Sequence, residues 1–402
     1  MKLQPGSPAL CQLICDRMAR SPQQRIPFAE FMELALYHPQ HGYYAASSAQ
    51  LGHTGDFVTS SHLDNDFGEL LAAQLAEMWH QLNYPHPFQL VEMGPGQGHL
   101  AETILSYLQR QHPDCLAATH YILIETSPAL KTEQQTRLQP WQAQGVSLNW
   151  CALTDLPQDS VTGCFFSNEL VDAFPVHRVM LTDTGLQEQY VTPSTQGQPL
   201  FEAVVGPLST PALADYFDPL GIRWDSPPYP VGFTTEVNLA ALTWMKDVAQ
   251  KLHQGYVLTI DYGYTAERYY SPTRSQGTLQ CYYRQAYHND PFVNVGQQDI
   301  TAHVDFTALA RQGQHSGLET LGSTPQGLFL MALGLGDRLN ELSQLQGTDG
   351  ATITYAIRRR EALHQLINPM GLGNFTVLLQ GKGLTAATQK HLRGLATPDT
   401  GI

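Results

Sequence analysis

Apolar strands alternate with amphipathic helices between residues 88 and 261, apart from an interruption at 176–235, and this alternation restricts the fold more than any other feature. The strands are expected at 88–92, 121–125, 146–150, 163–167 and 256–261. The helices between them are expected at 100–111, 128–142 and 237–252. Such a pattern predicts an α/β fold, with a mostly parallel sheet and helices on both faces. Right-handed crossovers then bring the carboxyl ends of the strands to one edge.

A glycine-rich turn, Glu92-Met93-Gly94-Pro95-Gly96-Gln97-Gly98, joins the first strand to the first of these helices. Its glycines let a ligand approach the backbone, and the helix N-terminus offers free N–H groups. A dinucleotide-binding turn reads Gly-x-Gly-x-x-Gly, but here the third glycine comes one residue early, leaving His99 in its place. The pattern Glu-x-Gly-x-Gly-x-Gly is typical of class I S-adenosylmethionine methyltransferases. Glu92, Gly94, Gly96 and Gly98 are therefore predicted to bind that cofactor, with a purely structural turn as the alternative.

Two acids follow the next two strands. Glu125 ends the second strand, where an acid can bind the hydroxyls of a ribose. Asp155 follows the third strand, on the side expected for an adenine. A surface or capping role is the alternative for Glu125, and a solvated turn is the alternative for Asp155.

A polar cluster follows the fourth strand. Asn168, Glu169 and Asp172 should face the pocket beside the glycine turn, because ligands bind beyond the carboxyl ends of such strands. Glu169 and Asp172 would share a face if this segment were helical. Carboxylates suit a cationic acceptor such as a guanidinium, which offers a planar fork of donors. We predict that these three residues are catalytic; a helix-capping cluster is the alternative.

Composition limits the choice of partners. The chain has 22 Lys and Arg against 36 Asp and Glu, a net charge of −14. Without a basic cluster, binding to nucleic acid is disfavoured. The histidines lack acidic or cysteine partners at ligand spacing, so no metal site is predicted. No uncharged apolar run is long enough to span a bilayer, and the N-terminus lacks a secretory signal, so we expect a cytoplasmic protein. Whether it forms a homodimer is left open.

The organisation expected from these patterns has five parts. They are an N-terminal helical lid region at 1–84, a cofactor-binding core at 85–175 and 236–264, an inserted antiparallel segment at 176–235, a substrate-side region of loop, helices and closing strand at 265–384, and a weakly ordered tail at 385–402. Within the fourth part, 265–304 is expected to form a long ordered loop.

An ordered series of segments resembles one known family, the MidA-like methyltransferases, over roughly residues 25–380. The matching segments are 28–39, Gly42-Tyr43-Tyr44, 55–60, Phe67-Gly68-Glu69-Leu70, 92–98, 167–175, 260–264, 277–280, 299–306 and Met370-Gly371. The chain departs from the family pattern at Ser61, where proline is expected, and at Cys281-Tyr282-Tyr283, where a less aromatic stretch is expected.

The resemblance implies a class I methyltransferase core that uses S-adenosylmethionine. It also implies methylation of protein arginine, because a mitochondrial relative symmetrically dimethylates an arginine of a respiratory complex I subunit. The loop around Asp56 would form part of a lid over the cofactor. Tyr43 and Tyr44 either line the pocket or pack in the core.

Three other functions stay open on the sequence alone. The acceptor could be a small molecule enclosed by the lid and the insertion. The protein could instead be an assembly chaperone with a vestigial cofactor site. A nicotinamide oxidoreductase is disfavoured by His99 in the glycine turn.

Overall fold

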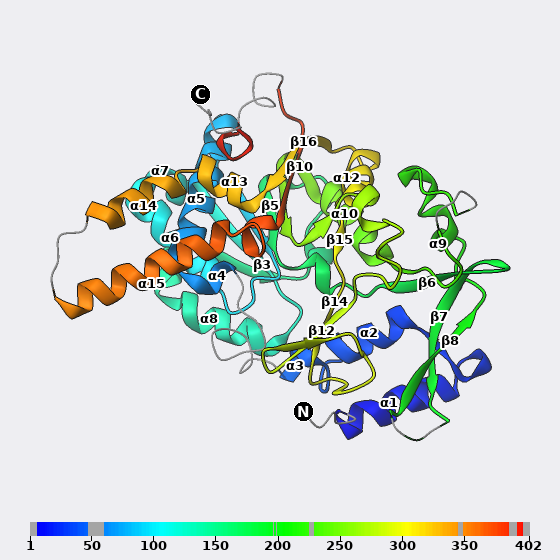
Figure 1. The fold of residues 1–402 in the computed structure, drawn as a ribbon. Coiled ribbons are helices and arrows are strands. Elements are labelled where there is room, and N and C mark those ends of the chain that lie inside the picture. The colour runs from blue at the N-terminus through cyan, green and yellow to red at the C-terminus, as the bar shows by residue number, and fades with distance from the viewer. Residues whose placement is uncertain are drawn as a thin grey trace. The chain divides into compact units, whose positions relative to one another are not determined.

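The structure is a computed structural model, and it describes residues 6–46, 60–195, 197, 199–224, 229–344, 349–385 and 392–396 (Figure 1). The chain divides into two units, each assembled from segments that are distant in sequence. The first unit contains Met1–Phe57, Val171–Met245 and Gly263–Gln312. The second contains Val58–Leu170, Lys246–Tyr262 and Gly313–Ile402. The five-part division expected from the sequence stays a prediction.

Among the described residues, the second unit contains a seven-stranded sheet. Its strands lie in the order β16 (Glu319–Pro325), β17 (Thr376–Lys382), β10 (Leu252–Asp261), β5 (Val161–Asn168), β2 (Phe88–Met93), β3 (Thr119–Ile124) and β4 (Ser147–Cys151). The last five are parallel, and β17 runs antiparallel to both its neighbours. The chain order reverses between β2 and β5, and ligands bind beyond the carboxyl ends of strands at such a point.

Both faces of this sheet are buried. Leu90 and Val91 on β2 point to opposite faces, as do Cys164 and Phe165 on β5, and all four side chains are inaccessible to solvent. Parallel sheets require such cover, because their strands carry apolar residues on both faces. The sequence-based prediction of an α/β fold with a mostly parallel sheet is confirmed.

The second unit contains helices that match the amphipathic patterns of the sequence and shorter ones that the sequence did not indicate. They are α4 (Ser60–Leu63), α5 (Asn65–Gln81), α6 (His99–Gln111), α7 (Pro113–Ala118), α8 (Pro128–Ala143), α13 (Gln326–Ala332), α14 (Leu335–Gln344) and α15 (Gly350–Ile367). Short 3-10 helices add η3 (Leu153–Asp155), η6 (Leu372–Asn374) and η7 (Arg393–Leu395). The unit boundaries fall inside α10 (Leu239–Lys251) and α12 (Phe306–His315). Among the described helices, none has both the length and the apolar character needed to cross a bilayer.

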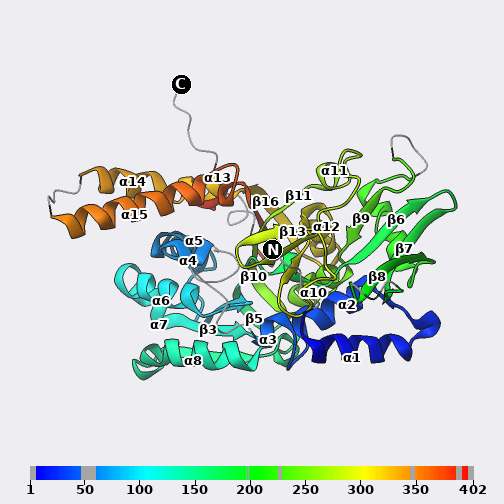
Figure 2. The ribbon, with the colours of Figure 1, turned by 60° about the horizontal axis from the view of Figure 1, so that its bottom comes forward.

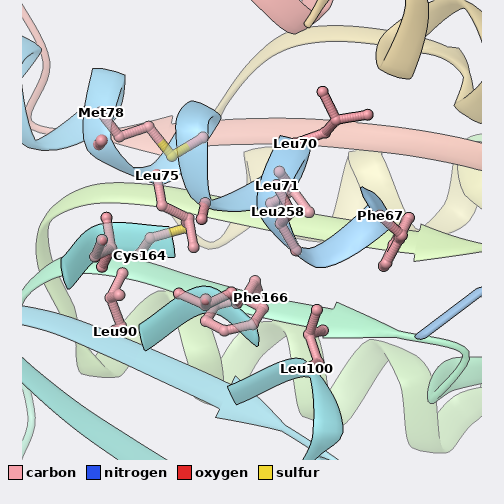
Figure 3. Packing of buried hydrophobic residues seen from close by; sticks show 14 of the residues in the cluster. Phe67, Leu70, Leu71, Leu75, Met78, Leu90, Leu100, Cys164, Phe166 and Leu258 are labelled. Carbon is pink, nitrogen blue, oxygen red and sulfur yellow. The ribbon is translucent and has the colours of Figure 1, made fainter. Parts of the chain in front are cut away.

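The core of the second unit forms where α5 packs on the sheet. Leu71 and Leu75 lie on one face of α5, because four residues correspond to about one helical turn. They pack near Leu90, Phe166 and Leu258 of three neighbouring strands (Figure 3). Each such side chain contributes about 1.5–3 kcal/mol when buried. This packing holds β2 and β5 in place under the candidate site.

A network of ion pairs links α5 to α14 and α15, which run side by side (Figure 2). Asp66, in the first turn of α5, is 2% exposed. Arg359 donates to both of its carboxylate oxygens at 2.7 Å. Arg338 bridges Asp66 and Glu69 at 2.5 Å to each. Because Asp66 is buried, these contacts compensate a charge that would otherwise destabilise the fold.

The first unit contains helices and antiparallel strands. Its helices are α1 (Pro8–Ala19), η1 (Pro22–Gln24), α2 (Phe28–Tyr37), α3 (Tyr43–Ala46), η4 (Val171–Ala173), α9 (Ala212–Asp215), η5 (Asp218–Leu220) and α11 (Ala266–Tyr269). Its largest sheet has the order β1 (Ile26–Pro27), β7 (Gly185–Pro193), β6 (His177–Thr182), β9 (Thr234–Val237), with β8 (Phe201–Gly206) also paired to β7. Every pairing in it is antiparallel, as expected for the insertion at 176–235.

The expectation of a long loop at 265–304 is wrong. This stretch contains α11, β12 (Gln280–Tyr283), β13 (Ala286–His288) and β14 (Asp299–Thr301), while β11 (Gly263–Tyr264) pairs with β15 (Val304–Asp305) at its two ends. Segments of two to four residues are too short to show a period in the sequence. The helix α7 has six residues, which is less than two helical turns, and it was missed as well. The strand β16 was also missed, because Gly322 and Pro325 interrupt its pattern.

Candidate functional site

The glycine turn lies between β2 and α6. Gly94, Gly96 and Gly98 have φ values of 68°, 53° and 80°, a region that favours glycine. A Cβ atom at Gly94 would lie 2.7 Å from Cδ1 of Leu170. One at Gly96 would meet no atom of the described residues within 4 Å. The turn therefore leaves the backbone at Gly96 open to a ligand.

Glu92 is a buried acid at the carboxyl end of β2. Its side chain is 3% exposed, and the Tyr121 hydroxyl donates a hydrogen bond of 2.6 Å to its Oε2. Burial raises the pKa of Glu92 to about 7. The Tyr121 hydrogen bond opposes this rise, and the nearby Glu125 carboxylate adds to it. Its protonation state therefore changes near neutral pH.

Glu125 follows β3 and is partly buried. Its Oε1 accepts a hydrogen bond of 2.7 Å from the Ser127 backbone N–H, and its Oε2 accepts one of 3.0 Å from Gln134 Nε2. Burial raises the pKa of Glu125, and these donors oppose the rise. The backbone N–H of Thr126 also interacts with this carboxylate. A carboxylate has about four acceptor positions, so a hydroxyl group of a ligand could still bind.

Glu92 and Glu125 are two acids at the ends of neighbouring strands, and burial raises the pKa of both. In the part of the chain that the structure describes, neither carboxylate forms an ion pair with lysine or arginine. A buried charge without a partner is unfavourable, so this arrangement favours a cationic ligand. S-adenosylmethionine carries a sulfonium and an ammonium group, and it fits the open glycine turn and this pair.

Two residues of α8, Gln134 and Arg137, donate hydrogen bonds to the glycine turn, and sequence reasoning missed them. Gln134 is fully buried and donates to the Gly96 carbonyl at 2.6 Å as well as to Glu125. Arg137 donates to the Gln97 carbonyl at 2.8 Å. One signal could have revealed Gln134, since it lies one turn from the buried Leu130 and Leu138 on the apolar face of the helix.

Two residues predicted to bind the cofactor have weaker structural support. Asp155 is exposed, and its carboxylate accepts a hydrogen bond of 2.9 Å from the Ala152 backbone within its own turn. This is the turn geometry that the sequence left open as an alternative. Asp56 and the rest of its loop lie outside the described residues. Their roles stay predictions.

Asn168 is the last residue of β5 in the second unit, and Glu169 follows it. Asn168 Nδ2 donates to Glu169 Oε1 at 3.0 Å, and the buried Ser60 donates its backbone N–H to the same oxygen at 3.1 Å. Glu169 has φ 53°, which is uncommon for a residue with a side chain. The expected helical face shared with Asp172 is therefore absent here, because a left-handed residue interrupts any helix at this point.

Asp172 lies in η4 of the first unit and is 6% exposed. Its carboxylate interacts electrostatically with Tyr44, whose hydroxyl donates a hydrogen bond of 3.0 Å to Asp299 Oδ1. The Tyr37 ring stacks on Tyr44 with centroids 5.3 Å apart. Burial, and then the Asp299 carboxylate, raise the pKa of Tyr44 well above its usual value. Sequence reasoning named Asp172 and Tyr44 but missed Asp299.

The parallel sheet, the left-handed glycine turn and the uncompensated acid pair together define a class I, S-adenosylmethionine-dependent methyltransferase. A family model described as "Putative S-adenosyl-L-methionine-dependent methyltransferase" matches residues 70–324. The chain belongs to this family, the MidA-like methyltransferases, as the ordered sequence motifs indicated. It is an enzyme of the S-adenosylmethionine-dependent class, and S-adenosylmethionine is its cofactor.

Relatives with assigned names cover most of the chain. The chain is 31% identical to "Protein arginine methyltransferase NDUFAF7 homolog, mitochondrial" of Drosophila melanogaster, over 79% of this chain and 73% of the relative. It is 29% identical to "Protein arginine methyltransferase NDUFAF7, mitochondrial" of Mus musculus, over 91% and 84%. A crystal structure from Burkholderia thailandensis, bound to S-adenosylhomocysteine, matches with a TM-score of 0.82 and 28% identity over 98% of both chains.

The cytoplasmic location expected from the sequence is corrected by these relatives, whose names describe mitochondrial proteins. The expectation rested on the lack of an apolar secretory core and on setting aside an organelle transit peptide around Arg17, Arg20 and Arg25, because Pro22 and Pro27 interrupt that region. A missing secretory core has no bearing on mitochondrial import, since transit peptides are amphipathic and rich in arginine.

Proposed function

We propose that this enzyme transfers methyl groups from S-adenosylmethionine to the guanidinium of an arginine in a protein, ending in symmetric dimethylarginine. The names of the relatives support this acceptor, because they describe protein arginine methyltransferases. The feature of this chain that carries the proposal is the set of polar side chains after β5, where Glu169 and Asp172 supply two carboxylates. By analogy with the mitochondrial relatives, a respiratory complex I subunit is the proposed substrate.

The residues divide into two groups by proposed role. Glu92, Gly94, Gly96, Gly98, Glu125, Asp155 and Asp56 are proposed to hold the cofactor, with Glu125 on its ribose. Asn168, Glu169 and Asp172 are proposed to hold the acceptor. A carboxylate can accept two parallel N–H bonds from a guanidinium, which fixes both the plane and the direction of the group. The net charge of −14 supports a cationic protein segment as the partner.

The proposed mechanism relies on alignment and on charge. When bound, S-adenosylmethionine supplies a methyl group on a positively charged sulfur. Glu169 and Asp172 would orient the guanidinium so that one nitrogen faces that methyl group. The nitrogen loses a proton as its bond to carbon forms, and the Asp172 carboxylate would accept it. Both carboxylates would also stabilise the positive charge of the acceptor before transfer.

The experiment that tests the acceptor uses radiolabelled S-adenosylmethionine and an extract from cells that lack this protein, because targets in ordinary cells are already methylated. Purified enzyme is added, protein is separated from small molecules, and the labelled protein is hydrolysed to amino acids. Label in symmetric dimethylarginine is expected. Label confined to small molecules, or no label while the cofactor still binds, would contradict the proposal.

The Asp172→Asn variant tests the acceptor side of the site. The amide keeps the shape of the side chain but cannot accept the proton, so transfer should fall about 100-fold. Affinity for S-adenosylhomocysteine should stay within about twofold, since Asp172 has no proposed role with the cofactor. Asp218→Asn, at an exposed position of the same unit, is the control. Unchanged turnover of Asp172→Asn would remove this residue from the mechanism.

A further inference from the structure

Gln134 connects three parts of the cofactor site that are separate in sequence. Its Nε2 reaches the Gly96 carbonyl at 2.6 Å and Glu125 Oε2 at 3.0 Å, and its Oε1 accepts from Trp150 Nε1 at 3.0 Å. Its Cγ would also lie 3.4 Å from a Cβ placed on Gly98. One fully buried side chain thus touches the glycine turn, the acid after β3 and the strand β4.

The chemistry of these partners fixes the orientation of the amide. An indole N–H can only donate, whereas a backbone carbonyl and an ionised carboxylate can only accept. Rotating the amide by half a turn would place its NH₂ against the indole of Trp150 and its oxygen against two acceptors. The Gln134 side chain is therefore locked in one orientation, and its two donors are aimed at Gly96 and Glu125.

We propose that Gln134 is a positioning residue for the cofactor. It holds the turn at Gly96 in the conformation that accepts the ligand, and it orients Glu125 in its ionised form. The groups that act on Glu125 come from three elements. They are Glu92 on β2, the backbone N–H groups of Thr126 and Ser127 after β3, and Gln134 on α8. The three donors favour the ionised form of Glu125, and the Glu125 carboxylate in turn raises the pKa of Glu92.

Arg137 provides a matched control on the same helix. It also holds the turn, through the Gln97 carbonyl at 2.8 Å, and it pairs with Glu102 at 3.1 Å. None of its contacts named here involves Glu125. Loss of Arg137 should therefore loosen the turn without changing the ionisation of Glu125, which separates a general loosening from the proposed role.

The test measures binding of S-adenosylhomocysteine by titration calorimetry between pH 5 and pH 8, with no methyl acceptor present. Gln134→Met keeps the length of the side chain but loses its donors, and it should bind about tenfold more weakly at pH 7. The midpoint of its affinity against pH should move up by about one unit, because Glu125 loses a donor. Gln134→Glu should bind S-adenosylhomocysteine more weakly still, because it places another carboxylate beside Glu125.

Arg137→Met should bind S-adenosylhomocysteine only about threefold more weakly, and its affinity should have the same pH midpoint as that of the original enzyme. Circular dichroism and thermal melts check that each variant is folded. If Gln134→Met does not fold, Trp150→Phe replaces it, since losing the indole N–H frees the amide and should move the midpoint in the same direction. The proposal would be overturned if the Gln134 variants bound S-adenosylhomocysteine as tightly as the original enzyme. It would also be overturned if they bound more weakly but the pH midpoint of their affinity did not move. Because no acceptor is used, the result is independent of the protein-arginine assignment.

Discussion

Replacing Glu92 with glutamine should remove a pH dependence from the stability of the ligand-free protein. The buried carboxyl accepts a hydrogen bond from Tyr121, and an amide oxygen can accept the same bond. The substitution therefore keeps the shape and the hydrogen bond while preventing ionisation. Any change in the response of stability to pH then comes from the charge.

The magnitude follows from the pKa of Glu92. Burial raises this pKa from 4.5 to about 7, so the folded protein holds a proton that the unfolded chain has already released. The contribution of Glu92 to the free energy of unfolding is fully present below pH 4.5 and is lost as the pH rises through 7. Between pH 5 and pH 8, linkage gives a loss of about 2 to 3 kcal/mol from this residue. The Glu92→Gln variant lacks this loss.

Urea unfolding of both proteins at pH 5, 6, 7 and 8 measures the effect. Other groups titrate in the same range, but they are common to both proteins, so the difference between the two curves isolates Glu92. The free energy of unfolding of Glu92→Gln should rise relative to the original by about 2 to 3 kcal/mol over this range. Glu361→Gln, at an exposed position, should leave the curve unchanged. Parallel curves for Glu92→Gln and the original protein would refute the reasoning.

Two further substitutions probe the glycine turn and the ion-pair network. Gly96→Ala should lower the free energy of unfolding by about 1 kcal/mol, because the backbone at Gly96 has a left-handed φ. It should also weaken S-adenosylhomocysteine binding more than about tenfold, because the added methyl group fills open space at the turn. Gly145→Ala has similar strain and open space outside the site, so calorimetry should find unchanged affinity there; equal affinity in both variants would contradict the assignment of the turn. Asp66→Ala leaves Arg338 and Arg359 without their buried partner and should lower the free energy of unfolding by about 3 kcal/mol in urea titrations. A change below about 1 kcal/mol would mean that Glu69 and solvent replace the contact.

The fold of the second unit could be predicted because its signals are long and regular. The strands that the sequence indicated in this unit have five or more residues and the helices have seven or more, which is enough for a period to show. The three-stranded sheet around β12 could not be predicted, because its strands have three or four residues. Their stability comes from pairing with segments distant in the sequence, which local patterns do not record.

The candidate site divides in the same way. Glu92 and Glu125 could be identified because they end strands of a parallel sheet, where position alone implies contact with a ligand. Gln134 was missed because it bears no charge and belongs to no motif. The backbone of Glu169 was also missed, since nothing in the local sequence requires a left-handed conformation there. Its position depends instead on pairing with β10, where its N–H donates to the Ile260 carbonyl at 2.9 Å.

The hydrogen bonds that Gln134 and Arg137 of α8 donate to the glycine turn end on main-chain oxygens, and this affects how the sequence of the turn can vary. Gln134 donates to the carbonyl of Gly96 and Arg137 to that of Gln97, so neither hydrogen bond depends on the side chain of residue 97. A turn grafted from another protein could keep both interactions if its backbone followed the same path. A grafted helix could not, because the two donors belong to side chains. Substitution of the side chain at position 97 is therefore better tolerated by these two contacts than substitution of Gln134 or Arg137.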